Sequence, residues 1–80
     1  MRIPEGITII GHHSLAFCKI RTLFLPKSLK EISGNAFDGS LIERIIYLGT
    51  MNDWSKVQLN GGWKNSLKVN IKCSDGEIKI

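Results

Sequence analysis

The stretch Ile20-Arg21-Thr22-Leu23-Phe24-Leu25 returns 22 residues later as Ile42-Glu43-Arg44-Ile45-Ile46-Tyr47. In both stretches a large apolar residue occupies the first, fourth and sixth positions. The last two of these are two positions apart, with one residue between them, a spacing that places both side chains on the same face of a β-strand. The sequence therefore predicts two strands, Thr22–Leu25 and Arg44–Tyr47, which lie side by side in parallel with these apolar residues pointing inward.

The same offset extends upstream of the two stretches without a gap. Its matched pairs are apolar on apolar or small on small: Ile3 with Leu25, Pro4 with Pro26, Ile7 with Leu29, Ile10 with Ile32, Ser14 with Ala36, Leu15 with Phe37 and Cys18 with Ser40. Self-similarity at a fixed period is the signature of a repeat architecture. We expect one domain over residues 1–80, in which 3–24 and 25–48 are two repeats and 49–80 form a C-terminal cap. In each repeat we expect a short helical turn, near 14–17 and 35–37, and a second short strand, at 7–10 and 29–32.

These repeats resemble the BspA-like leucine-rich repeats. The spacing L-x-x-L-x-L is that of the strand segment of a leucine-rich repeat. The segment from Leu25 to Phe37 looks like the BspA-like unit, because Leu25-Pro26, Ile32-Ser33 and Ala36-Phe37 stand where that unit has Ile-Pro, Ile-Gly and Ala-Phe. Cys18 stands at the cysteine place of that unit, where the second copy has Ser40. The resemblance, which covers 3–76, implies an α/β repeat fold: a mostly β leucine-rich-repeat solenoid fragment from a bacterial surface protein of the adhesin kind.

After residue 48 the repeat period is lost, as expected of a terminal unit that hides the core from water. Thr50 followed by Asp53 is close to a capping box and predicts a short helix from Met51 to about Val57. Alternation of apolar and polar residues predicts a half-buried strand over 67–73, and Asp75-Gly76 predicts a hairpin turn into 77–80.

Composition and charge argue against several functions. The chain has a net charge of +4, but its basic residues are scattered without a run of five, so we expect no nucleic-acid binding. No apolar stretch approaches the length of a membrane span, and the N-terminal residues lack the apolar segment of a signal peptide. We also find no carboxylate pair, triad or cofactor motif, and therefore expect neither an enzyme nor a cofactor.

Individual reactive or aromatic residues have ordinary structural interpretations. Adjacent histidines, His12 and His13, point apart on any element and are better explained as a surface loop than as a metal site. Cys18 is predicted to be a buried thiol and Cys73 to end a strand, with no disulfide between them. Trp54 and Trp63 are more readily core residues than a platform for a sugar or base.

The outward positions of the strands are the candidate partner-binding face: Thr22, Phe24, Arg44, Ile46, Lys68, Asn70 and Lys72. An apolar centre with a basic rim suits protein recognition, but outward aromatic and β-branched residues also occur in sheets that bind nothing. The sequence thus favours a non-catalytic binding or adhesion module, secreted or at the cell surface. The alternative is a purely structural capping segment. Self-association through the open N-terminal end is a further expectation, and the partner otherwise is a host or bacterial surface protein.

Overall fold

The computed structural model describes residues 1–80, which form a small, mostly strand domain with one short helix. The elements in chain order are β1 (Ile9–Ile10), β2 (Lys19–Leu25), β3 (Glu31–Ile32), β4 (Leu41–Tyr47), α1 (Met51–Trp54), β5 (Gln58–Leu59), β6 (Ile71–Cys73) and β7 (Gly76–Ile78).

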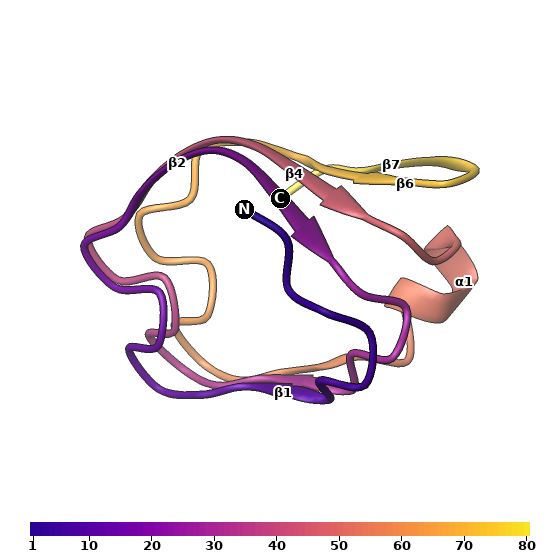
Figure 1. Cartoon of the computed structure of the whole chain (residues 1–80), viewed down its shortest axis with the longest axis horizontal. Coiled ribbons are helices and arrows are strands. Elements are labelled where there is room, and N and C mark those ends of the chain that lie inside the picture. The colour runs from indigo at the N-terminus through magenta and orange to yellow at the C-terminus, as the bar shows by residue number, and fades with distance from the viewer.

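The strands form two sheets on opposite sides of the core. One sheet has the order β1-β3-β5, and the other has the order β2-β4-β6-β7; every pairing is parallel except that of β6 with β7. Figure 1 shows β2 and β4 following the same upper path while β1 lies along the lower side. The chain thus alternates between the sheets, and we call β1–β2, β3–β4 and β5–β6 its first, second and third passes.

The register of the long strands matches the sequence repeat. Leu23 pairs with Ile45 and Leu25 with Tyr47, so each residue lies beside its counterpart in the next repeat. All four side chains are at most 1% exposed, as their spacing predicted. The parallel pair and its inward face are therefore confirmed.

The strands of the other sheet are shorter than predicted. β1 begins at Ile9 and β3 at Glu31, because each is preceded by a turn that starts at a proline. The amide of Ile7 donates to the carbonyl of Pro4 at 3.3 Å, and the corresponding bond to Pro26 measures 3.2 Å. A chain that closes such a turn cannot also be extended there.

The predicted helical turns near 14–17 and 35–37 are wrong. Residues 12–17 and 34–39 instead form consecutive hydrogen-bonded turns. His13, Phe17, Asn35 and Gly39 all have φ between 58° and 73°, the left-handed region, which interrupts a right-handed helix. The positions recur at the repeat offset, so this corner is a repeated feature of the fold.

The third pass departs from the sequence prediction in two ways. β5, which was not predicted, pairs Leu59 with Ile32, and β6 pairs Ile71 with Ile45, so this segment extends both sheets although its residues lie farther along the chain than the repeat offset would place them. The predicted strand over 67–73 is shorter, since β6 begins only at Ile71; Ser66 just before this segment has φ of 74°. The capping role of residues 49–80 stays a prediction.

The hairpin and the helix also differ in detail from their predictions. Cys73 pairs with Gly76, so the hairpin loop is Ser74-Asp75 rather than Asp75-Gly76. The helix ends at Trp54 rather than near Val57, because the amide of Val57 bonds to the carbonyl of Trp54, three residues back. Such tighter bonds close a helix without continuing it.

An aromatic group fills the core beside α1. Trp54 is 4% exposed and lies edge-on to Tyr47, with ring centroids 5.2 Å apart; Trp63 follows at 5.8 Å. Trp63 is 9% exposed, which confirms that both tryptophans are core residues. They belong to one cluster of 17 buried residues that spans all three passes.

Candidate partner-binding face

The outward face of the four-stranded sheet carries a row of side chains that crosses every strand. Parallel and antiparallel register place its members side by side in the order Arg2, Phe24, Ile46, Lys72 and Glu77. Arg2 lies over the ring of Phe24, with its guanidinium carbon 5.2 Å from the ring centroid. The row has an apolar centre and charged ends.

A second set of polar side chains lies beside this row. Thr22 is directly opposite Arg44 in the register of β2 and β4. Asn70 precedes β6, and its side-chain amide donates to a carboxylate oxygen of Glu77 at 2.7 Å. Asn70 also accepts a hydrogen bond from the amide of Ile80, at 3.4 Å, so the C-terminal residues hold it in place.

Most of the residues proposed from the sequence share this face, with one exception. The structure aligns Phe24 with Ile46 and Lys72, as the two-residue alternation implied. Lys68 lies outside any strand, because β6 begins three residues later, and it is exposed without an ion-pair partner. It therefore does not belong to the aligned rows.

Sequence reasoning missed several charged residues of this face. Arg2 belongs to this face because it pairs with Phe24 of β2, which lies 22 residues later. The same offset aligns Ile3 with Leu25, so the sequence repeat already implied this pairing. Arg21 and Glu43 face each other at that same offset, 3.5 Å apart. The position of Glu77 on this face depends on the register of the hairpin. The sequence indicated a turn near Asp75 but did not fix that register.

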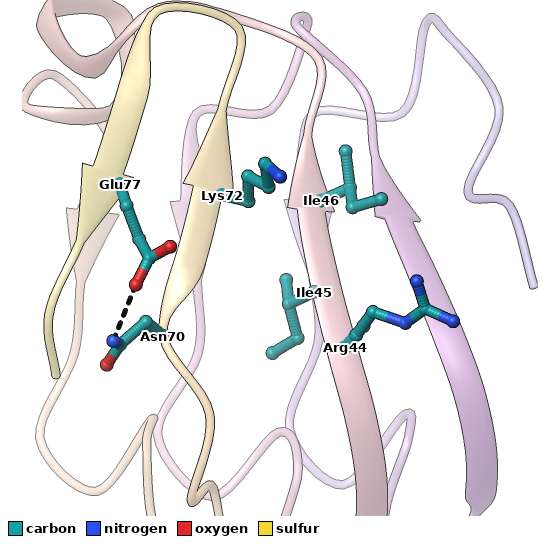
Figure 2. A pocket seen from close by; sticks show the side chains of 6 residues that line it. All are labelled: Arg44, Ile45, Ile46, Asn70, Lys72 and Glu77. Carbon is teal, nitrogen blue, oxygen red and sulfur yellow. Dashed lines mark hydrogen bonds between the residues drawn. The ribbon is translucent and has the colours of Figure 1, made fainter.

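A shallow pocket of about 270 Å³ opens on this face between β4 and the hairpin. Its lining residues are Arg44, Ile45, Ile46, Asn70, Lys72 and Glu77. Figure 2 shows the side chain of Arg44 leaning toward β2, whereas the side chain of Lys72 leans from β6 toward β4. Asn70 and Glu77 form the far wall, joined by their hydrogen bond.

The remaining candidates are structural or stand apart from this face. His12 and His13 are exposed turn residues, as predicted, and the ring nitrogen Nδ1 of His12 lies 2.7 Å from the carbonyl oxygen of Gly34. A carbonyl can only accept, so this nitrogen carries the proton. No group of three or more histidine, cysteine or acidic residues could hold a metal ion.

Cys18 is only half-buried, which corrects the prediction of a buried thiol. It lies in the first pass, where only the second pass packs against it; the matching Ser40, between two passes, is 1% exposed. Cys73 is buried, and burial together with the charge of Asp75 raises the pKa of its thiol.

A comparison with models of protein families identifies the family to which this chain belongs. The model of the BspA type leucine-rich repeat region, which describes six copies, matches residues 1–72. The chain belongs to this family. BspA-type leucine-rich repeats are generally non-enzymatic and typically occur in surface or secreted proteins, and leucine-rich repeats generally mediate protein–protein interactions.

No match to this BspA-type chain was found among curated proteins or among solved structures. None of its helices has the length and apolar character needed to cross a membrane.

Proposed function

We propose that this chain is a non-catalytic protein-binding module, and that its binding surface is the outward face of the sheet β2-β4-β6-β7. The family supports an interaction module, and the row from Arg2 to Lys72 supports this face as the place of contact. Aligned apolar side chains with a charged rim are the arrangement that protein interfaces use at their centre.

The structural setting of the module is part of the same proposal. The first two passes are the closing repeats of a leucine-rich-repeat solenoid, and residues 49–80, which contain the third pass, cap it. The parent is a secreted or cell-surface protein of bacterial origin that acts in adhesion. The typical location of the family supports this setting, and the alternation of the chain between two sheets, whose successive passes pair in parallel, supports the solenoid.

The proposal is tested by substituting the centre of the row. Peptides that bind the wild-type chain are selected from a random peptide library and are then measured against the double variant Phe24→Ala, Arg44→Ala by calorimetry. We expect a loss of binding with nearly unchanged unfolding free energy, because Phe24 is only partly buried and Arg44 is exposed. Unchanged binding would place the contact elsewhere, and a collapse in stability would make the two residues structural.

A specific observation favours a second candidate, self-association through the N-terminal end. A pocket of about 260 Å³ at this end has mainly apolar lining, which includes Ile3, Ile7 and Ile9. Ile7 and Ile9 are 41% and 54% exposed. In the second pass the matching Leu29 is 4% exposed, because the neighbouring passes cover it. In the parent solenoid a preceding repeat would cover this surface, and for residues 1–80 alone a second copy of the chain would cover it in the same way.

A further inference from the structure

The charges of the outward face are not balanced. Its two acidic side chains are both engaged: Glu43 pairs with Arg21, and Glu77 accepts from Asn70. Arg44 and Lys72, in contrast, form no ion pair with any carboxylate, although both are exposed. Both cations line the pocket beside the apolar side chain of Ile46: Lys72 leans into it although its register partner is Glu77, whereas the guanidinium of Arg44 lies at its rim, toward β2 (Figure 2).

The apolar part of the face lies within reach of these cations. Ile46 is the register partner of both Phe24 and Lys72, so it is one strand spacing, about 4.8 Å, from each. Arg44 is two residues away along the same strand, or about 7 Å. A single short segment of a partner could place an apolar side chain on Ile46 and a carboxylate beside either cation.

A nucleic acid fits this face less well than a protein segment does. A base that stacked on Phe24 would have to displace the guanidinium of Arg2 from the ring, whereas an apolar side chain can pack on Ile46 and against the rest of Phe24 beside it. A continuous chain of phosphates crossing the sheet would also meet Glu43 on β4 and Glu77 on β7. The observations therefore favour isolated carboxylates over a polyanion.

We propose that the pocket between β4 and β6 takes an aspartate or glutamate side chain of an extended, acidic partner segment, whose neighbouring apolar side chain packs on Ile46 and Phe24. This inference rests on the proposed function, since it assigns the partner's chemistry at the same face. Arg44 and Lys72 supply the charge, and the apolar row supplies the contact area.

The test uses the whole chain and the peptides selected from the random library. We expect the selected peptides to be enriched in an acidic residue next to an apolar one. Because exposed ion pairs contribute little individually, Arg44→Gln and Lys72→Gln should each lower affinity about threefold and together about tenfold. The matched control is Lys64→Gln, which removes the same charge from an exposed turn outside the face and should leave affinity unchanged.

The same measurements separate the failure of this inference from that of the proposed function. Peptides that require Phe24 and Ile46 but carry no acidic residue would overturn the acidic partner and leave the binding face intact. Peptides whose binding survives the Phe24→Ala, Arg44→Ala variant would overturn both proposals. Tighter binding of a single-stranded oligonucleotide than of any selected peptide, lost in the Arg44→Gln, Lys72→Gln variant, would assign the site to nucleic acid instead.

Discussion

Gly34 lies against the backbone carbonyl of Gly61, so that a Cβ on Gly34 would collide with that oxygen. The contact joins the corners of the second and third passes, where the amide of Asn35 also donates to the carbonyl of Gly62 at 3.2 Å. Neither partner is a flexible side chain. The approach of the two passes is therefore limited by backbone alone.

The variant Gly34→Ala should accordingly be destabilised. A Cβ in a filled space forces the two passes apart, and overpacking of this kind costs about 1–3 kcal/mol of unfolding free energy. Gly11→Ala is the matched control, because nothing lies within 4 Å of its added Cβ. Chemical denaturation of both variants measures the difference, and equal stabilities would contradict the backbone contact.

A second prediction concerns Ser40, whose hydroxyl is buried without a hydrogen-bond partner. An unsatisfied buried hydroxyl is unfavourable, and the first repeat has Cys18 at the same place. Ser40→Cys should therefore stabilise the chain by about 1 kcal/mol. Ser28→Ala is the contrast: the Ser28 hydroxyl accepts from the amide of Gly6 at 2.9 Å and donates to the carbonyl of Ile7 at 2.8 Å, so this change should destabilise.

Thermal unfolding should show a rise in the unfolding temperature for Ser40→Cys and a fall for Ser28→Ala if the Ser40 hydroxyl has no hydrogen-bond partner and the Ser28 hydroxyl has two. A loss of stability in Ser40→Cys, repeated in Ser40→Ala, would show that the Ser40 hydroxyl has a partner after all. The comparison isolates the hydroxyl, because cysteine retains most of the shape of serine at a site that is 1% exposed.

The third prediction is a dependence of stability on pH through the helix cap. Thr50 and Asp53 cap α1 reciprocally: the amide of each donates to the side chain of the other at 3.0 Å. The backbone hydrogen bond from Thr50, followed by that from its side chain, lowers the pKa of Asp53. A lowered folded-state pKa means that the stabilisation is present above the unfolded value, about 3.9, and is lost as the pH falls below it.

Asp53→Asn should remove this part of the acid sensitivity. The difference in unfolding free energy between wild type and variant is expected to grow as the pH rises from about 2 to 5 and then to stay constant. Guanidinium denaturation at several pH values measures it. A difference that is already complete at the lowest pH would show that the carboxylate charge is not involved.

The two thiols provide a fourth prediction. Cys18 is half-buried, whereas Cys73 is buried and its thiol pKa is raised. Since the thiolate is the reactive form, a thiol reagent near neutral pH should label Cys18 first and Cys73 only as the chain unfolds. Mass spectrometry of the labelled peptides identifies the order. Absence of labelling at both sites after unfolding would reveal the disulfide that the sequence argued against.

The sequence predicted strand pairing correctly wherever similar residues recur 22 positions apart. The pairing of Leu23 with Ile45 follows from the repeat period and from the spacing of the apolar residues, both of which can be read from the sequence. The third pass could not be aligned, because α1 is inserted before β5 and moves Leu59 beyond the position that the repeat period assigns to the partner of Ile32. The first corner had little sequence signal, because Phe17 is left-handed, with φ of 59°, without being a glycine; in the second corner Gly39 stands at the matching position and was the signal that could have revealed both turns.

The residues of the candidate binding face likewise divide into those that the sequence predicted and those that it did not. Phe24 and Ile46 were predictable from alternation within a strand, whereas Glu77 reaches the pocket only through the register of a hairpin. Lys68 was misplaced because the apolar alternation from Leu67 to Val69 continues through a segment that is not a strand. Alternation alone gives both segments the same pattern, and hydrogen bonding to β4 distinguishes them.

The last prediction concerns the apolar N-terminal end. If two copies meet there, Ile9 of β1 lies in the contact, because it is 54% exposed on the outer edge of its sheet. Ile9→Lys would bury a charge without a partner in that contact and should raise the dissociation constant about tenfold or more. Leu59→Lys, on the opposite edge strand β5, is the matched control.

Analytical ultracentrifugation over a range of concentrations distinguishes three outcomes for these two variants. Weakening by Ile9→Lys alone supports contact between two N-terminal ends. Equal weakening by both variants indicates head-to-tail stacking, since each copy would then contribute a different edge. A wild-type chain that stays monomeric at high concentration would falsify self-association and leave the exposed isoleucines as a surface for a different occupant.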